Sequence, residues 1–328
     1  MNKTIRWGIL GPGRIADKFA SDLKLADCAT IQSVGSRSIE RARAFARNHE
    51  IPNAHGDYES LASDPEVDIV YIATPHPQHR ENVLSCLRSA KAVLCEKPIT
   101  VNARETREII ELARERRLFL MEAMWTRFLP TMRKVKAWID DGAIGEVKML
   151  NADFGFRAPR NPDQRHLNKK LGGGAVLDTG IYTVSLASWV FGAQPSRIES
   201  TAYIGETGVD EWFTALFDYG AGRMASLTDA VQLPLTTEAL VIGTEGKIHI
   251  PVFLAAKKAT LTRLDNTEET YTDNGMGRGM QYEANEAMRC LREGLIESPV
   301  IPLDESLAIM ESLDALRAQW KLEFEADR

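Results

Sequence analysis

The chain has 328 residues, of which 44% are hydrophobic and 26% charged, so it is long and apolar enough to form more than one domain. Its formal net charge is −6 and its 40 basic residues are spread out, which argues against nucleic acid or a membrane surface as a partner. The 4 scattered cysteines, without a CxxC pair, favour the reducing cytoplasm over a disulfide framework or structural zinc. We expect no targeting segment and no apolar run of the roughly 18 residues that a membrane span needs.

Short β-rich runs alternate with helical patterns from Thr4 to about Met124. The runs are residues 4–10, 29–36, 67–74, 91–97 and 117–123. The segments 38–50 and 103–117 between them have apolar residues at helical spacing. Strands that alternate with such helices predict right-handed βαβ units and a parallel sheet covered on both faces. We therefore predict a doubly wound, Rossmann-type domain over residues 1–124.

The pattern changes after about Trp125. A helical stretch at 131–142 precedes longer β-type runs joined by Gly-containing turns, and two helical patterns end the chain at 281–294 and 304–322. The β-type runs are residues 146–157, 196–205, 213–220, 222–231, 237–244, 246–250 and 259–264. Consecutive strands predict an antiparallel or mixed sheet, hence an α+β second domain over 125–328. The fold class is therefore α/β, and the last helix is able to pack back on the first domain.

A glycine-rich turn follows the first predicted strand. Gly11, Gly13 and Ala16 form GxGxxA. The first glycine permits a tight turn, the second lets a pyrophosphate approach the backbone, and the small third residue lets a helix pack on the strand. The helix N-terminus, with Arg14 and Ile15, offers N–H groups to phosphates. The alternative is a glycine-rich turn kept for packing, but its position in a βαβ array favours a dinucleotide site.

The end of the second predicted strand bears on the choice of dinucleotide. It reads Gly35-Ser36-Arg37-Ser38, with Arg41 one helical turn later. NAD-binding proteins usually have Asp or Glu here for the ribose 2′-hydroxyl, whereas a guanidinium can grip a 2′-phosphate and a serine hydroxyl can add a donor. Ser36, Arg37 and Arg41 therefore predict NADP rather than NAD. The alternative is that both arginines are ordinary solvated charges.

Two further motifs follow predicted parallel strands. Residues 73–79 read ATPHPQH, and the run 91–97 ends in Glu96-Lys97 before Pro98, in the crevice where ligands of open α/β sheets bind. Together with GxGxxA, in this order, they resemble the Gfo/Idh/MocA family of nicotinamide-dependent oxidoreductases. The resemblance covers nearly the whole chain, and it implies a second domain that binds substrate and forms oligomers. It also implies cofactor contacts from Thr74, His76, His79, Glu96 and Lys97.

The resemblance further implies an acid/base group in the motif that runs from Gly172 to Tyr182. Asp178 and Tyr182 are four residues apart and would share one face of a helix. Many family members have histidine where this chain has Tyr182. The tyrosine version, together with MEAMWTRF at 121–128, resembles the branch that contains the dimeric dihydrodiol dehydrogenases and the NADP-dependent D-xylose dehydrogenases.

The residue chemistry supports a role for Tyr182 in proton transfer. A free phenol has a pKa near 10, and a nearby ammonium such as that of Lys97 favours the phenolate. We predict that Tyr182 is the acid/base, that Lys97 stabilises the oxyanion, and that Asp178 orients a substrate hydroxyl or Lys97. The alternative is that Tyr182 is a core tyrosine.

The resemblance also implies which residues form the wall of the substrate pocket. Its residues are Trp125, Phe154, Phe156 and Arg157, although any one of them could equally be a core residue. Aromatic faces suit the apolar face of a sugar or an arene diol. His76 and His79 have the HxxH spacing of two metal ligands, but no third ligand is evident, so no metal is expected.

The expected function is hydride transfer between nicotinamide C4 and a sugar, polyol or diol hydroxyl or carbonyl carbon. The alternatives are a reductase of an aldose or ketose derivative such as anhydrofructose, a dihydrodiol activity, and an NADP-binding regulator without turnover. The open face of a large antiparallel sheet predicts at least a homodimer.

Overall fold

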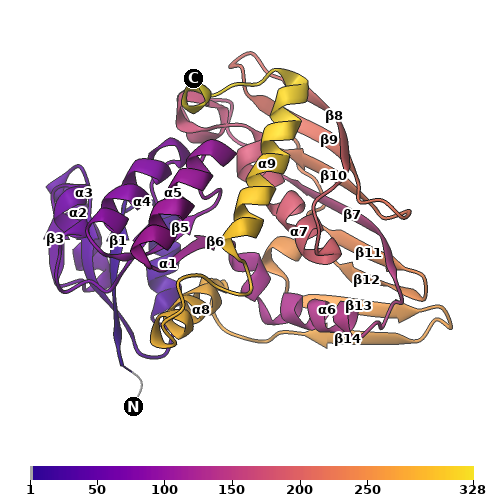
Figure 1. Ribbon diagram of the computed structural model, residues 1–328, viewed down its shortest axis with the longest axis horizontal. Helices are drawn as coiled ribbons and strands as arrows, with labels where there is room; N and C mark the ends of the chain where they lie inside the picture. The colour runs from indigo at the N-terminus through magenta and orange to yellow at the C-terminus, as the bar shows by residue number, and fades with distance from the viewer. Residues whose placement is uncertain (1–2) are drawn as a thin grey trace. The chain divides into compact units, whose positions relative to one another are not determined.

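The computed structural model describes residues 3–328, which divide into two compact units (Figure 1). The first comprises residues up to Thr100, Arg104–Phe128 and Met276–Leu307. The second comprises Val101–Ala103, Leu129–Gly275 and Ala308–Arg328. These units differ from the expected division into 1–124 and 125–328, because 276–307 groups with the first unit. The functional division itself stays a prediction.

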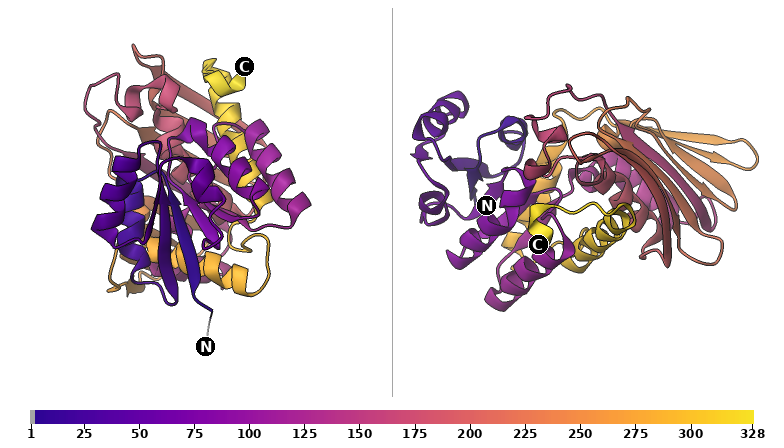
Figure 2. Two further views of the ribbon diagram at one scale, coloured as in Figure 1. Left: turned by 90° about the vertical axis from the view of Figure 1, so that its left-hand side faces the viewer. Right: turned by 90° about the horizontal axis from the view of Figure 1, so that it is seen from above.

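The first unit contains a six-stranded parallel sheet with the order β3-β2-β1-β4-β5-β6. Its strands are β1 (Ile5–Leu10), β2 (Ala29–Gly35), β3 (Asn53–His55), β4 (Ile69–Ile72), β5 (Ala92–Glu96) and β6 (Leu120–Ala123). Its helices include α1 (Arg14–Leu23), α2 (Ile39–His49), α3 (Tyr58–Ala62), α4 (His79–Arg88), α5 (Ala103–Arg116) and α8 (Met280–Arg292). Figure 2 shows helices on both sides of the sheet, and β4 and β5 are buried along their whole length. The doubly wound parallel domain is confirmed.

A buried carboxylate explains why a late segment of the chain belongs to the first unit. Asp22 on α1 is 2% exposed, and its Oδ2 accepts hydrogen bonds from the backbone N–H groups of Arg278, Gly279 and Met280 at 2.9, 3.0 and 3.1 Å. A carboxylate at a helix N-terminus satisfies amides that have no partner within the helix and interacts favourably with the helix dipole. Asp22 therefore fixes the start of α8 against α1.

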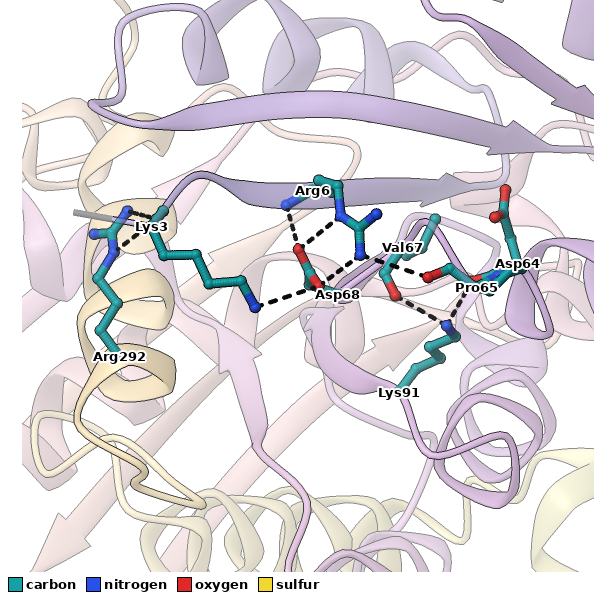
Figure 3. Close-up of polar contacts among 8 residues, drawn as sticks. All are labelled: Lys3, Arg6, Asp64, Pro65, Val67, Asp68, Lys91 and Arg292. Atoms are coloured by element: carbon teal, nitrogen blue, oxygen red, sulfur yellow. Dashed lines mark hydrogen bonds and ion pairs between the residues drawn. The ribbon is translucent and has the colours of Figure 1, made fainter. Parts of the chain in front are cut away.

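Polar contacts also brace the amino end of the parallel sheet (Figure 3). Arg6 on β1 donates from Nε and Nη2 to the Asp68 carboxylate, each at 3.1 Å. The buried Lys91, just before β5, donates from Nζ to the carbonyl oxygens of Asp64 and Val67, and burial lowers its pKa. These groups join the starts of β1, β4 and β5, at the edge opposite the glycine-rich turn, so we assign them a structural role.

The second unit contains an eight-stranded sheet with the order β14-β13-β12-β11-β7-β10-β9-β8. Its strands are β7 (Val147–Gly155), β8 (Arg197–Ile204), β9 (Asp210–Asp218), β10 (Met224–Ala230), β11 (Ala239–Gly243), β12 (Gly246–Ile250), β13 (Lys258–Arg263) and β14 (Glu268–Thr272). Neighbouring strands are antiparallel except β7 and β10, which run parallel. The predicted mainly antiparallel sheet is confirmed.

Helices cover one face of this sheet (Figure 1). α7 (Ile181–Phe191) contacts β7 and β10, and α6 (Pro130–Asp140) contacts β13 and β14. Phe213 and Phe217 are buried on the covered face, whereas Leu216 between them is 57% exposed on the other face. The last long helix, α9 (Leu303–Trp320), contributes residues 303–307 to the first unit and 308–320 to the second.

One stretch has the length and composition of a membrane span, but it is buried inside the protein. It is Lys169–Phe191, and 89% of its most apolar window is buried inside the protein. A helix at the centre of a protein core has the same composition as a membrane span, because both are surrounded by apolar groups. The burial identifies this stretch as a core helix of the second unit.

Candidate active site

The backbone of the glycine-rich turn leaves room for an anionic ligand. Gly11 has φ +90°, and a Cβ there would lie 2.9 Å from Thr74 Cγ2, so this position requires glycine. A Cβ at Gly13 would meet nothing nearer than the Gly11 carbonyl oxygen at 4.0 Å. α1 begins directly after Gly13 with no side-chain cap. A pyrophosphate therefore fits the open space at Gly13 and the amides at the start of α1, including those of Arg14 and Ile15.

The end of β2 lies beside this turn, because β1 and β2 are neighbours in the sheet. Ser36 is buried, and its Oγ accepts a hydrogen bond from the Ser38 N–H at 3.3 Å. Arg37 and Arg41 are exposed, and neither forms an ion pair with any of residues 3–328. Two uncompensated guanidinium groups at this edge suit the 2′-phosphate of NADP.

His79 joins two of the predicted cofactor segments. It has no exposed surface, its Nδ1 lies 2.9 Å from the Pro98 carbonyl oxygen, and its Nε2 lies 2.8 Å from the Thr74 carbonyl oxygen. The Thr74 hydroxyl also accepts from Asn82 Nδ2 at 2.9 Å, and the His76 ring lies 5.7 Å from that of His79. His79 thus ties the segment after β4 to the turn after β5, and its contact with the cofactor stays a prediction.

The turn that carries Lys97 is held by buried groups. Tyr71 on β4 donates its hydroxyl proton to Glu96 at the end of β5. Two residues after Lys97, the Ile99 N–H donates to Glu122 Oε1 at 3.0 Å, and burial raises the pKa of Glu122. The carboxyl ends of parallel strands share one edge of the sheet, so the fold brings Lys97 to the same edge as the glycine-rich turn and His79.

The remaining predicted residues divide between the two units. Trp125 begins the short helix Trp125–Phe128 of the first unit. Phe154 lies on β7, and the exposed Arg157 follows that strand, forming an isolated bridge with Gln232 in the second unit. Asp178 and Tyr182 belong to the second unit as well, whereas Lys97 belongs to the first.

Asp178 and Tyr182 lie on a helical segment that begins with a π-turn, Val176–Gly180, and continues as α7. Single π-turns within helices often mark functional sites. The Tyr182 ring meets that of Phe154 edge to face at 5.7 Å, and the Phe156 ring lies 6.0 Å from Phe154. Asp178 is 6% exposed and Tyr182 8%. A mostly buried phenol therefore lies beside an aromatic wall.

Two residues that the sequence analysis did not select reach Asp178. Arg165 Nη2 lies 3.0 and 3.2 Å from the two Asp178 carboxylate oxygens. His166 Nε2 lies 3.5 Å from Asp178 Oδ2, and its ring meets the Phe156 ring at 5.1 Å. The guanidinium favours the ionised form of the carboxyl and fixes its orientation. Asp178, Arg165 and His166 thus form a charged group next to the aromatic wall.

The glycine triplet before this segment explains how Arg165 and His166 arrive there. The N–H groups of Gly173 and Gly174 donate to the carbonyl oxygens of Asn168 and His166, each at 3.0 Å. A Cβ at Gly173 would lie 2.8 Å from the His166 carbonyl oxygen, so only glycine permits this approach. The triplet was therefore the sequence signal that an upstream turn packs against the helix start.

No group of three or more His, Cys, Asp or Glu side chains within residues 3–328 is arranged to hold a metal ion. His76 and His79 do not form part of one.

The doubly wound sheet and its glycine-rich turn define a dinucleotide-binding oxidoreductase, and comparison with known families agrees. Residues 5–124 match the model of an oxidoreductase family with an NAD-binding Rossmann fold, and residues 132–249 match the Gfo/Idh/MocA C-terminal domain. The chain belongs to the Gfo/Idh/MocA family of oxidoreductases.

The chain is similar to dehydrogenases and to a ketoreductase of known structure. The chain is 38% identical to trans-1,2-dihydrobenzene-1,2-diol dehydrogenase of Xenopus laevis, covering 94% of this chain and 96% of that one. It is 39% identical to the Homo sapiens enzyme of the same name, covering 99% of both chains. A 3-ketoreductase from Actinomadura kijaniata, solved with NADP and TDP-benzene, has a TM-score of 0.85 and 26% identity, covering 96% of this chain and 98% of that one. The chain is an oxidoreductase of the dihydrodiol dehydrogenase branch.

Proposed function

We propose that the chain is an NADP-dependent dehydrogenase acting on a hydroxyl or carbonyl carbon of a sugar, polyol or diol. The observation that carries this proposal is the cluster on the second unit, in which Tyr182 lies against Phe154 and Asp178 is paired with Arg165. An aromatic wall beside a polar group suits a ligand with an apolar face and hydroxyl groups. The dihydrodiol dehydrogenases that the chain resembles over nearly their whole length support a diol.

Proton transfer in this proposal belongs to Tyr182. In the oxidative direction, the Tyr182 oxygen takes the proton of the substrate hydroxyl, and the Lys97 ammonium stabilises the negative charge that develops on the substrate oxygen. Asp178, oriented by Arg165, binds a second hydroxyl of the substrate. When bound, NADP supplies the hydride acceptor at nicotinamide C4. The convergence of Lys97 and Tyr182 on one oxygen is part of the proposal.

NADP is favoured over NAD because Arg37 and Arg41 are exposed at the end of β2 without an ion-pair partner among residues 3–328. The NADP bound in the Actinomadura kijaniata 3-ketoreductase supports the same choice. In the reverse reaction, the same groups serve a carbonyl substrate, which is how the chain would act as a reductase of an aldose or ketose derivative.

Replacement of Tyr182 by Phe tests the proposed acid/base. We expect Tyr182→Phe to reduce kcat by about 10²–10⁴-fold, because the phenol no longer exchanges the substrate proton. NADPH affinity, measured by fluorescence titration, should stay unchanged. Tyr271→Phe, on the edge strand β14, is the matched control and should keep full activity. Full turnover by Tyr182→Phe would remove Tyr182 from the mechanism.

A substrate panel distinguishes the candidate functions. Aldoses, dicarbonyls, polyols and diols would be tested with NADP or NADPH, and the change in absorbance at the nicotinamide band recorded. Turnover of diols or sugars supports the dehydrogenase, and turnover confined to carbonyl compounds supports the reductase. NADPH binding without turnover of any of these compounds would favour a regulator instead.

The same proposal includes a homodimer in the cytoplasm. Cys28, Cys86, Cys95 and Cys290 are all free thiols, as expected in a reducing compartment. The uncovered face of the eight-stranded sheet carries exposed apolar side chains on neighbouring strands, with Tyr203 47%, Leu216 57% and Met224 45% exposed. Exposed apolar side chains on an uncovered sheet face favour association with a second copy.

A further inference from the structure

Two buried acids support the segment that carries Asp178 and Tyr182, and the reaction proposed above uses neither. Asp210 begins β9 and Asp229 lies near the end of β10, and neither has any exposed surface. Asp210 Oδ2 accepts the Val176 N–H at 2.6 Å, and Asp229 Oδ2 accepts the Thr183 hydroxyl proton at 2.6 Å. Asp210 therefore holds the first turn of the segment, and Asp229 holds a position just after Tyr182.

The second oxygen of each carboxyl has no hydrogen-bond partner within residues 3–328. Asp210 Oδ1 faces Gly174, where a Cβ would collide with it. A buried acceptor without a partner is costly, and the cost is largest when the group is charged. The protonation of these two acids therefore decides how strongly they hold the segment.

The surroundings of Asp210 and Asp229 shift the pKa values of the two acids differently. Burial raises the pKa of Asp210 to about 7, against the opposing effects of the Val176 N–H and the charge of Arg317. Burial raises the pKa of Asp229 well above its usual range, which favours the neutral form of this carboxyl. Asp210 therefore exchanges its proton near neutral pH.

The charged and titratable groups around Asp210 come from four elements. Arg317 on α9 is 4% exposed and forms ion pairs with Asp314 and Asp327. The others are Asp229 on β10, whose own charged neighbour on β7 is Asp153, and Glu211, which follows Asp210 on β9. Arg317 is already paired with two carboxylates, so it only partly offsets the burial of Asp210.

We propose that Asp210 is a positioning residue that holds the Asp178–Tyr182 segment firmly only as the carboxylate. The inference rests on the roles proposed above for Asp178 and Tyr182. A hydrogen bond to a charged acceptor is about twice as strong as one between neutral groups, and negative charge is favourable at the N-terminus of a helical segment. Loss of the Asp210 proton to solvent therefore strengthens the bond from Val176 and fixes the start of the segment.

Hydrogen–deuterium exchange tests how firmly Asp210 holds the segment and does not require turnover of a substrate. Exchange of peptides covering residues 175–183, corrected for the intrinsic effect of pH, should be about fivefold slower at pH 8 than at pH 6 in the wild type. Asp210→Asn keeps an oxygen acceptor but cannot ionise, so its exchange should not change between these pH values. Glu211→Gln is the matched control on the same strand and should behave as the wild type. Equal pH dependence in wild type and Asp210→Asn would overturn the proposal.

The pH profile of kcat tests the consequence for the reaction. With NADP and the best substrate of the panel, kcat of the wild type and of Glu211→Gln should rise about fivefold as pH increases through 7. The kcat of Asp210→Asn should stay at the low value that the wild type has below pH 7. A rise retained in Asp210→Asn contradicts the positioning role. If no substrate is turned over, the proposed function fails and the exchange experiment alone decides the inference. If Asp210→Asn does not fold, the smaller and uncharged Asp210→Ser takes its place.

Discussion

Glu283 is a buried acid whose ionisation is coupled to the stability of the first unit. It lies on α8 with no exposed surface, and neither of its oxygens has a hydrogen-bond partner within residues 3–328. Burial, with smaller effects from Glu96 and Asp22, raises the pKa of Glu283 well above its usual range. The carboxyl is therefore protonated in the folded chain at pH values where an unfolded chain has released that proton.

The sign of this coupling gives a stability prediction. The pKa of Glu283 is raised in the folded chain. Its contribution to the free energy of unfolding is therefore fully present below the pKa of about 4.3 that it has in the unfolded chain, and is lost as pH rises towards the pKa in the folded chain. Glu283→Gln cannot ionise, so at pH 8 it should exceed the wild type by at least about 1 kcal/mol, with little difference at pH 4.5. Urea denaturation at the two pH values measures this. The exposed Glu111→Gln on α5 is the control, and a gain that does not depend on pH would contradict the prediction.

Arg37 is the residue that we predict to set the preference between NADP and NAD. We expect Arg37→Asp to lower the preference for NADP over NAD by about 10²-fold or more, because a guanidinium that binds the 2′-phosphate is replaced by a carboxylate that repels it. The ratio of kcat/KM for the two cofactors is the measurement. Arg43→Asp, an equally exposed arginine on α2, should leave the ratio unchanged. Unaltered NADP affinity in Arg37→Asp would discredit the assignment.

At the scale of the element, Gly174 controls how the π-turn begins. Its φ is +116°, and a Cβ there would collide with the Asp210 carboxyl. We expect Gly174→Ala to destabilise the protein by about 2–4 kcal/mol, because strain of the backbone and overpacking add. Gly142 also has a positive φ of +70° but has nothing within 4 Å of the Cβ position, so Gly142→Ala should cost only about 1 kcal/mol. Equal losses in urea denaturation would show that the contact with Asp210 has no effect.

Helices and strands differ in how clearly their sequences predict them. The runs that became β1, β4 and β5 are mostly apolar, and the reason is their burial in a parallel sheet that is covered on both faces. The short strands β3 (Asn53–His55) and β14 (Glu268–Thr272) were not predicted. Both lie at sheet edges, where few residues are buried, so their sequences have no clear alternation.

At the scale of the whole molecule, the uncovered face of the eight-stranded sheet predicts the oligomeric state. We expect the wild type to sediment as a homodimer and Leu216→Glu to sediment as a monomer, because a charge would enter an apolar contact. Leu264→Glu, which changes a 73% exposed residue after β13, is the control and should stay dimeric. Sedimentation velocity at several concentrations is the measurement. A Leu216→Glu dimer, or a monomeric wild type, would contradict the predicted surface.

The sequence by itself determined the parts of this protein that depend on local geometry. GxGxxA at Gly11, the alternation of strands and helices, and the placing of Lys97 after a strand follow from backbone conformation and hydrophobic period, which neighbouring residues set. The fold class and the family were therefore predicted correctly. The roles of Lys97 and Tyr182 stay predictions.

Only the tertiary structure decided which residues distant in the chain support the site. Asp210 reaches Val176 across 34 residues, Arg165 reaches Asp178, and Asp22 caps α8 across more than 250 residues. Asp210 and Asp22 have no periodic or motif signal in the sequence, because the contacts of each buried carboxyl form only when the chain has folded. The assignment of 276–307 to the first unit has a similar cause, since Asp22 at the start of α8 and the bond from Ser306 to Glu122 are also contacts between residues far apart in the chain.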